Sequence, residues 1–255
     1  MNKIALITGA TSGIGEAIAQ KLAAENYDLI LTGRRAERLH DVATTLTTSY
    51  NIKVLPLVFD VRNNDEVTRQ LGEIPQEWQA IEVLINNAGL AVGLTAIQDG
   101  VLDDWERMID TNVKGLLYVS KAVLPYLIAR ASGTIINIGS IAAKEAYGKG
   151  NVYCGTKHAV DAITKGMRID LLEHNIRVGA IHPGMVDTEF SLVRFKGDKV
   201  AADKVYENLT PLYAQDIADA LWFMLSRPAH VCINDMVIMP TVQANTSNTI
   251  RRVIQ

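Results

Sequence analysis

The sequence places a tyrosine and a lysine four residues apart, within Asn151-Val152-Tyr153-Cys154-Gly155-Thr156-Lys157. If this segment is helical, both side chains project from the same face, one turn apart. A free phenol titrates near ~10, so it needs help to exchange a proton at neutral pH. An ammonium about 4 Å away would favour the phenolate by up to about 4 kcal/mol at an effective dielectric near ~20, which is roughly three pKa units. We therefore expect Tyr153 to be an acid/base group whose pKa Lys157 lowers.

The composition predicts an ordinary soluble globular protein. The 255 residues suit a single α/β domain, and 48% of them are hydrophobic and 21% charged. A net charge of −3 argues against a nucleic acid or an anionic membrane surface as partner. The amino terminus lacks secretory features, and no apolar run reaches the ~18 residues that a membrane span needs. We expect a cytoplasmic protein.

The cysteines and histidines indicate neither a disulfide scaffold nor a metal site. Cys154 and Cys232 are too few for either, and on a helix Cys154 points about 100° away from Tyr153, where packing explains it. The histidines show no paired spacing typical of metal ligands. They are His40, His158, His174, His182 and His230. We expect no metal.

A glycine-rich turn follows the first apolar segment. The run 3–7 reads as a strand, and Thr8-Gly9-Ala10-Thr11-Ser12-Gly13-Ile14-Gly15 leads into a segment with helical periodicity. Glycines let the backbone approach a pyrophosphate, which binds at the positive end of a helix. The spacing differs from the common G-x-G-x-x-G, but a strand, this turn and a helix in that order predict dinucleotide binding.

Two arginines follow the second predicted strand, Asp28–Thr32. An NAD enzyme would place an acid here to bind the ribose 2′-hydroxyl, whereas Arg34 and Arg35 are suited to a phosphate. A solvated arginine pair opening the helix 36–46 is the alternative. The absence of an acid at this strand end favours NADP(H).

The next strands end in polar residues at the edge where cofactors bind. After the strand 53–59, Asp60 either accepts from the adenine amine or caps the helix that starts near residue 64, and its position favours the first role. After the strand 82–85, Asn86-Asn87-Ala88-Gly89 suits close passage of the cofactor. The segment 72–80 reads as a surface crossover.

Two further polar residues precede the tyrosine. Asn112 lies in a predicted long helix, 103–130, where asparagine is mildly unfavourable, so its amide is expected to order a water or a bent backbone carbonyl. Ser140 follows a fifth strand, 133–138, thirteen residues before Tyr153. A sixth strand, 177–181, leads into Pro183-Gly184.

In this order the motifs resemble those of the short-chain dehydrogenase/reductase superfamily along nearly the whole chain. The resemblance implies a single-domain, Rossmann-type, doubly wound α/β fold with a seven-stranded parallel sheet and helices on both faces. It implies that Tyr153 is the acid/base, that Ser140 holds the substrate oxygen and that Lys157 binds the nicotinamide ribose. Asn112 would anchor a proton-relay water. The implied NADP(H)-binding residues are Gly9, Thr11, Ser12, Gly13, Ile14, Gly15, Arg34, Arg35, Asp60, Val61, Asn87, Ala88, Gly89, Tyr153, Lys157, Pro183, Gly184, Val186 and Thr188.

A narrower resemblance is to the NADP-dependent 3-hydroxy acid dehydrogenases and the related sulfoacetaldehyde reductases. It is carried by segments such as Asp60-Val61-Arg62-Asn63, Asp104-Trp105-Glu106 and Val193-Arg194-Phe195-Lys196-Gly197-Asp198. It implies a small anionic hydroxy acid, or its aldehyde, as substrate. We expect Arg194 to bind the substrate anion and Tyr147 to donate a hydrogen bond beside Ser140 and Tyr153. Weaker candidates for the anion are Lys196, Arg251 and Arg252.

Alternative functions are a 3-oxoacyl carrier-protein reductase and a non-catalytic NADP-binding sensor on the same fold. The first would need a concentrated basic face, which the sequence lacks, and the second has no use for the complete set Asn112, Ser140, Tyr153 and Lys157. We divide the chain into one domain, residues 1–240, and a polar tail, 241–255. By resemblance the protein is a homotetramer in which the tail contacts a neighbouring subunit.

Overall fold

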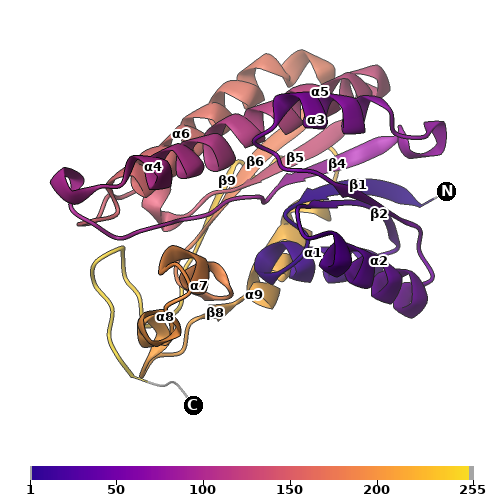
Figure 1. Cartoon of the computed structure of the whole chain (residues 1–255). Coiled ribbons are helices and arrows are strands. Elements are labelled where there is room, and N and C mark those ends of the chain that lie inside the picture. The colour runs from indigo at the N-terminus through magenta and orange to yellow at the C-terminus, as the bar shows by residue number, and fades with distance from the viewer. Residues whose placement is uncertain (1, 253–255) are drawn as a thin grey trace.

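A seven-stranded parallel sheet forms the centre of the computed structural model, which describes residues 2–252 (Figure 1). The strand order is β3-β2-β1-β4-β5-β6-β9, and every neighbouring pair is parallel. The strands are β1 (Lys3–Thr8), β2 (Tyr27–Gly33), β3 (Val54–Val58), β4 (Ile81–Asn86), β5 (Gly133–Ile138), β6 (Ile176–Pro183) and β9 (Asp235–Ile238). A separate short pair joins β7 (Val186–Asp187) to β8 (Leu212–Tyr213).

The central strands are mostly apolar and buried because helices cover both faces of the sheet. One layer, below the sheet in Figure 1, contains α1 (Gly13–Ala24), α2 (Ala36–Tyr50) and α9 (Ala214–Leu225). The other contains α3 (Asn64–Gly72), α4 (Leu102–Ile109), α5 (Leu116–Arg130) and α6 (Asn151–Asp170). Two short helices, α7 (Phe190–Arg194) and α8 (Lys199–Tyr206), lie beside the carboxyl ends of the strands.

The predicted fold class is confirmed, and the six predicted strands are present, with each end within two residues of its expected position. The seventh strand, expected only by resemblance, is β9, which pairs with β6 at the edge of the sheet. The segment 72–80 is less superficial than predicted. Its Trp78 is buried in the apolar core between the sheet and the layer of α3 and α5.

The predicted long helix 103–130 is wrong in one respect. It is divided into α4, a π-helical turn over Asp110–Gly115, and α5. A π turn inserts one residue into the helical repeat and is common at functional sites. This turn explains why an asparagine is found at position 112. Asn112 lies in the π turn, and its side-chain amide forms a hydrogen bond with Leu90, outside the helix.

Buried polar side chains connect the sheet to two helices on the same face. The amide of Asn86 on β4 donates to Ser120 on α5 and to Asn137 on β5, both at 2.9 Å. Asn137 in turn donates to the hydroxyl of Thr164 on α6 at 2.8 Å. This amide–hydroxyl ladder therefore runs from α5 through two strands to α6.

The last described residues pack on their own chain. Val242 and Gln243 are buried, and the side-chain oxygen of Gln243 accepts from the backbone N–H of Met185 at 2.8 Å. Gln243 also forms an antiparallel bridge with Thr249. The predicted tail extends beyond the described residues, because residues 253–255 lie outside them. Among residues 2–252, no helix has the length and hydrophobicity needed to cross a membrane.

Candidate active site

The glycine-rich turn between β1 and α1 has the shape that a phosphate-bearing ligand requires. Gly9 and Gly13 have left-handed backbones, with φ of 67° and 55°. A side chain at Gly15 would collide with the carbonyl of Gly9. The N-cap residue of α1, Ser12, makes no capping bond to the first turn. The backbone N–H groups at this helix end are therefore suited to an anion such as a pyrophosphate.

Thr8 and Asn87 join the carboxyl ends of β1 and β4 beside this turn. The Thr8 hydroxyl accepts from the backbone N–H groups of Asn87 and Ala88, at 3.0 and 2.9 Å. The Asn87 amide donates to the carbonyls of Thr8 and Gly9. These bonds hold the segment 87–89 against the glycine turn, where the cofactor was expected to pass. This role of Thr8 was not expected from the sequence.

Arg34 and Arg35 lie at the end of β2, next to the glycine turn. Arg35 donates to the hydroxyls of Thr11 and Ser12, at 2.9 and 2.7 Å. It also forms an ion pair with Glu189, at 2.9 Å. The arginines, the hydroxyls and the bare helix end form a basic cradle that fits a ribose 2′-phosphate and the adjoining pyrophosphate.

Asp60 does not cap α3, so that alternative is wrong. Asn63 is the cap residue, and its side-chain oxygen accepts from the backbone N–H groups of the first turn. Asp60 instead forms ion pairs with Arg62, at 2.7 Å, and with Arg34, at 3.6 Å. Partial burial opposes its ionisation, but the hydrogen bonds from Arg62, together with the charges of Arg62 and Arg34, outweigh burial and lower the pKa of the Asp60 carboxyl.

Tyr153 and Lys157 lie in the first turns of α6 and are both buried, at 8% and 6% exposure. The ammonium of Lys157 donates to the carbonyl of Ile138 at 2.9 Å and lies 6.0 Å from the centre of the Tyr153 ring. Burial raises the pKa of the Tyr153 phenol, and nearby Tyr147 adds to the rise. A hydrogen bond with Ser140 and the charge of Arg194 oppose it. Burial also lowers the pKa of Lys157, to about 8.

The expectation that Lys157 lowers the pKa of Tyr153 is therefore wrong for this structure. The attraction between ammonium and phenolate is opposed by the cost of burying the phenolate, which a residue spacing does not reveal. That cost is the larger effect here, and the ammonium is bonded to the carbonyl of Ile138. Tyr153 is consequently a neutral phenol at physiological pH, which is the proton-donating form.

Ser140 lies just past β5, where a short 3-10 helix, Ile141–Ala143, begins. Its hydroxyl oxygen accepts from the backbone N–H of Ala142 at 3.1 Å and is the group that hydrogen-bonds Tyr153. The structure thus brings together the hydroxyls of two residues thirteen positions apart, as expected. Both can contact one carbonyl oxygen of a substrate.

Asn112 links the π turn to the opposite loop and to α6. Its side-chain oxygen accepts from the N–H of Leu90 at 2.8 Å. Its amide donates to the carbonyl of Leu90, at 2.8 Å, and to the hydroxyl of Thr156, at 3.0 Å. Thr156 donates to the carbonyl of Tyr153. Asn112 therefore orients, through Thr156, the helix turn that carries Tyr153. Nothing in the sequence around Thr156 predicted this role.

Arg194, at the end of α7, lies over the rings of two tyrosines. Its guanidinium carbon is 5.4 Å from the ring centre of Tyr147 and 5.6 Å from that of Tyr153. One of its nitrogens donates to the Tyr147 hydroxyl at 2.7 Å, while its Nε is buried without a hydrogen-bond partner. No carboxylate of residues 2–252 forms an ion pair with it within 4.0 Å. Arg194 is thus a cation that faces Tyr153 without a counter-charge.

The weaker candidates for binding an anion have other partners. Lys196 forms an ion pair with Asp104 at 2.8 Å, and Arg251 donates to the carbonyls of Lys204 and Glu207. The structure shows Arg252 as exposed.

The remaining predicted cofactor residues continue around the same strand ends. The Thr188 side chain faces Gly13, so the segment after β7 approaches the glycine turn. Gly184 packs against Gln243, and Val186 is buried. The other predicted cofactor residues, which also lie at or near the carboxyl ends of the strands, are Ile14, Val61, Gly89 and Pro183.

Comparisons with known proteins find relatives along nearly the whole chain. A family model described as short chain dehydrogenase matches residues 3–198. An NADP-dependent 3-hydroxy acid dehydrogenase from Salmonella typhi is 45% identical over 98% of this chain and 99% of its own length. Sulfoacetaldehyde reductase 2 from Chromohalobacter salexigens is 44% identical over 96% of each chain. A solved structure, the closed form of a serine dehydrogenase complexed with NADP+, is 43% identical, with a TM-score of 0.91 over 98% of this chain and 99% of that one.

Proposed function

This chain belongs to the short-chain dehydrogenase family and is an NADP-dependent oxidoreductase, and on that premise we propose that it interconverts a small anionic 3-hydroxy acid and its carbonyl form. The acid is either a carboxylate, such as serine or 3-hydroxypropionate, or the sulfonate isethionate. The matching aldehydes include malonate semialdehyde and sulfoacetaldehyde. A relative named 3-hydroxy acid dehydrogenase is 45% identical to this chain, and one named sulfoacetaldehyde reductase is 44% identical.

The observation that carries the proposal is Arg194. A half-buried guanidinium beside the acid/base tyrosine, with no carboxylate neighbour among the described residues, attracts an anion to the place where the reacting carbon must lie. The Tyr147 hydroxyl, held by Arg194 at 2.7 Å, can donate to the same anion. A neutral substrate would leave Arg194 without a counter-charge.

NADPH, when bound, supplies the hydride for reduction, and NADP+ accepts it in oxidation. The chain would hold this cofactor on the glycine turn, on the segment 87–89 and on Arg34 and Arg35. In reduction, Tyr153 donates its phenolic proton to the carbonyl oxygen as negative charge develops there. Ser140 donates a hydrogen bond to the same oxygen. Lys157 and Asn112 hold the groups around the phenol, and a proton-relay water on Asn112 remains part of the proposal.

The proposal is tested with the purified full-length protein. NADPH consumption is followed at about 340 nm with malonate semialdehyde, sulfoacetaldehyde and the neutral methylglyoxal. NADP+ reduction is followed with serine, 3-hydroxypropionate and isethionate. We expect kcat/KM for at least one anionic substrate to exceed that for methylglyoxal by tenfold or more, since hydrogen bonds to charged groups are worth about 1.5–3 kcal/mol. A preference for methylglyoxal, or no turnover of any anion, would contradict the proposal.

We also propose that the protein is a cytoplasmic homotetramer with one catalytic domain, 1–240, whose tail, 241–255, contacts a neighbour. Large apolar side chains on the outer surfaces of α5 and α6 and just after α6 support an interface, since Leu117, Ile169 and Leu172 are 40%, 75% and 74% exposed. Light scattering of the full chain and of a chain lacking its last eight residues tests this. A monomeric full chain would contradict it, and so would a truncated chain with unchanged mass and KM.

A further inference from the structure

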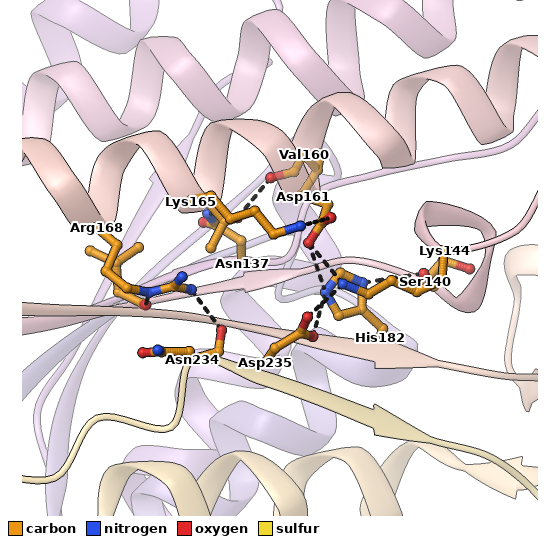
Figure 2. Close-up of polar contacts among 12 residues, drawn as sticks. Asn137, Ser140, Lys144, Val160, Asp161, Lys165, Arg168, His182, Asn234 and Asp235 are labelled. Atoms are coloured by element: carbon orange, nitrogen blue, oxygen red, sulfur yellow. Dashed lines mark hydrogen bonds and ion pairs between the residues drawn. The ribbon is translucent and has the colours of Figure 1, made fainter.

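A charged cluster lies directly behind the loop that carries Ser140 (Figure 2). Its centre is His182 of β6, whose side chain is completely buried. Around it lie Lys144, just after the 3-10 helix, Asp161 of α6 and Asp235 at the start of β9. The sequence showed no such cluster, because its members are up to 91 residues apart.

The ring of His182 contacts the backbone of the Ser140 loop. Its Nδ1 lies 3.2 Å from the carbonyl oxygen of Ser140. The ring also lies so close to Gly139 that any side chain at that position would collide with it. The backbone N–H of Gly139 donates to the carbonyl of Ile181, which precedes the histidine on β6. The position of Ser140 therefore depends on the position of this ring.

The opposite side of the ring faces two carboxylates. Nε2 lies 3.0 Å from Asp235 and 3.6 Å from Asp161, although neither contact has the geometry of a hydrogen bond. Lys144 forms ion pairs with both carboxylates, and the exposed Lys165 pairs with Asp161 from its outer side at 2.7 Å. Burial lowers the pKa of the His182 imidazole, which favours the neutral ring. A neutral ring protonated on Nδ1 can donate to the carbonyl of Ser140, while Nε2 faces the carboxylates without a hydrogen bond.

A metal ion is a weaker explanation of the cluster. One ligand atom each from Asp161, His182 and Asp235 lies within 4.8 Å of the others. The Lys144 ammonium, however, bonds both carboxylates and already supplies the positive charge that a cation would bring. The cluster is instead placed to connect four elements: the Ser140 loop, α6, β6 and β9.

We propose that His182 is a positioning residue for Ser140, holding its backbone carbonyl while the ion pairs of Lys144 with Asp161 and Asp235 hold the loop and the ring against α6. Asp161 lies two helical turns beyond Tyr153 on α6, so the same cluster connects the serine loop to the helix that carries the phenol. The cluster thereby fixes the distance between the hydroxyls of Ser140 and Tyr153, the two groups that contact the substrate oxygen. The inference rests on the proposed role of Ser140 in the reaction.

The first test replaces His182 with Leu, which has similar bulk but no donor, and with Asn, whose amide can take the place of Nδ1. We expect His182→Leu to lower kcat about tenfold while KM for NADPH stays within about twofold, because a misplaced hydroxyl weakens a contact made to the reacting oxygen. His182→Asn should restore kcat to within about threefold of the wild type. Equal losses in both variants, or a wild-type kcat in folded His182→Leu, would overturn the proposal.

A second test keeps the histidine and changes its surroundings, in case the buried substitution prevents folding. Lys144→Met should lower kcat about threefold without changing KM for NADPH, since it frees the loop from α6. Lys165→Met is the matched control, because it removes a cation from the same carboxylate but touches neither the ring nor the loop. Equal kcat in the two variants would count against the proposal, as would loss of wild-type activity on dialysis against EDTA.

These measurements can use any carbonyl substrate that the wild type reduces. Failure of the anionic substrates would therefore refute the proposed function without deciding the role of His182. Conversely, wild-type kinetics in the His182 variants would remove the positioning role and leave the proposed function intact.

Discussion

The guanidinium of Arg35 lies 2.9 Å from the carboxylate of Glu189, a residue 154 positions later in the chain. Arg38 reaches the other oxygen of the same carboxylate at 2.7 Å. These bonds lower the pKa of the Glu189 carboxyl, so it is ionised at neutral pH. Glu189 directly precedes α7, the helix that ends with Arg194. An ion-paired carboxylate thus connects the basic cradle to the segment that faces the tyrosines.

The substitution Glu189→Gln should tighten the binding of NADPH. Glu189 competes with a 2′-phosphate for the guanidinium of Arg35, and exposed ion pairs of this kind are worth about 0.2–1 kcal/mol, or up to about fivefold in Kd. Titration calorimetry measures the change, with NADH as the control, because NADH carries no 2′-phosphate. Weaker binding of NADPH in the variant would show that Glu189 orients the arginine rather than competing for it.

The substitution Arg194→Met should raise KM for an anionic substrate by about tenfold or more and leave KM for methylglyoxal within about threefold. The methionine retains apolar contact with the two tyrosine rings but not the charge. Lys196→Met is the matched control, since it removes a nearby cation that is already paired with Asp104. Equal effects of Arg194→Met on charged and neutral substrates would remove the proposed anion site.

The substitution Tyr153→Phe should lower kcat by about 10²–10⁴-fold, the range for loss of a general acid, while NADPH still binds. Because burial raises the pKa of Tyr153, the phenol stays protonated through the neutral range. We therefore expect kcat for reduction to be independent of this group between about pH 6 and 9. Oxidation needs the phenolate, so its kcat should rise with pH. An ionisation near neutrality in the reductive profile, lost in Tyr153→Phe, would contradict this.

Lys157 should make stability depend on pH in the alkaline range. Folding lowers its pKa to about 8, from ~10.4 in the unfolded chain. Between these values the unfolded chain binds the proton and the folded chain does not, so stability rises with pH and is lost as pH falls through about 8. Relative to Lys157→Met, we expect the wild-type free energy of unfolding to rise by roughly 1–3 kcal/mol from about pH 7 to 10.

Urea unfolding at several pH values measures this difference. The control is Lys165→Met, which removes a lysine whose side chain is 57% exposed rather than buried. A wild-type stability that falls relative to Lys157→Met as pH rises would mean that the ammonium is favoured in the folded state.

Local patterns in the sequence predicted the framework of the site well. Arg34, Asn87 and Ser140 lie within two residues after the ends of β2, β4 and β5. The four-residue spacing of Tyr153 and Lys157 requires only a helix to bring them together. The seventh strand was expected only by resemblance, because β9 is short and its exposed residues alternate with half-buried ones.

Properties set by distant contacts could not be predicted in this way. The raised pKa of Tyr153 depends on burial by residues from α7 and from the loop before α6, including Phe190 and Tyr147. The partnership of Glu189 with Arg35 and the cluster around His182 join residues that no local pattern relates. The π turn around Asn112 could not be predicted from a local pattern either, since helical periodicity alone predicts an uninterrupted helix.

The amide–hydroxyl ladder has a consequence for how such a protein can evolve. Packed apolar side chains tolerate small slippage between helix and sheet, whereas each bond of the ladder needs its donor opposite its acceptor. The ladder holds α5, which continues from the Asn112 turn, and α6, which carries Tyr153, in register with β4 and β5. Mutations around Arg194 lie outside it. A lineage can therefore acquire a new substrate by changing that outer segment while inheriting the same reaction.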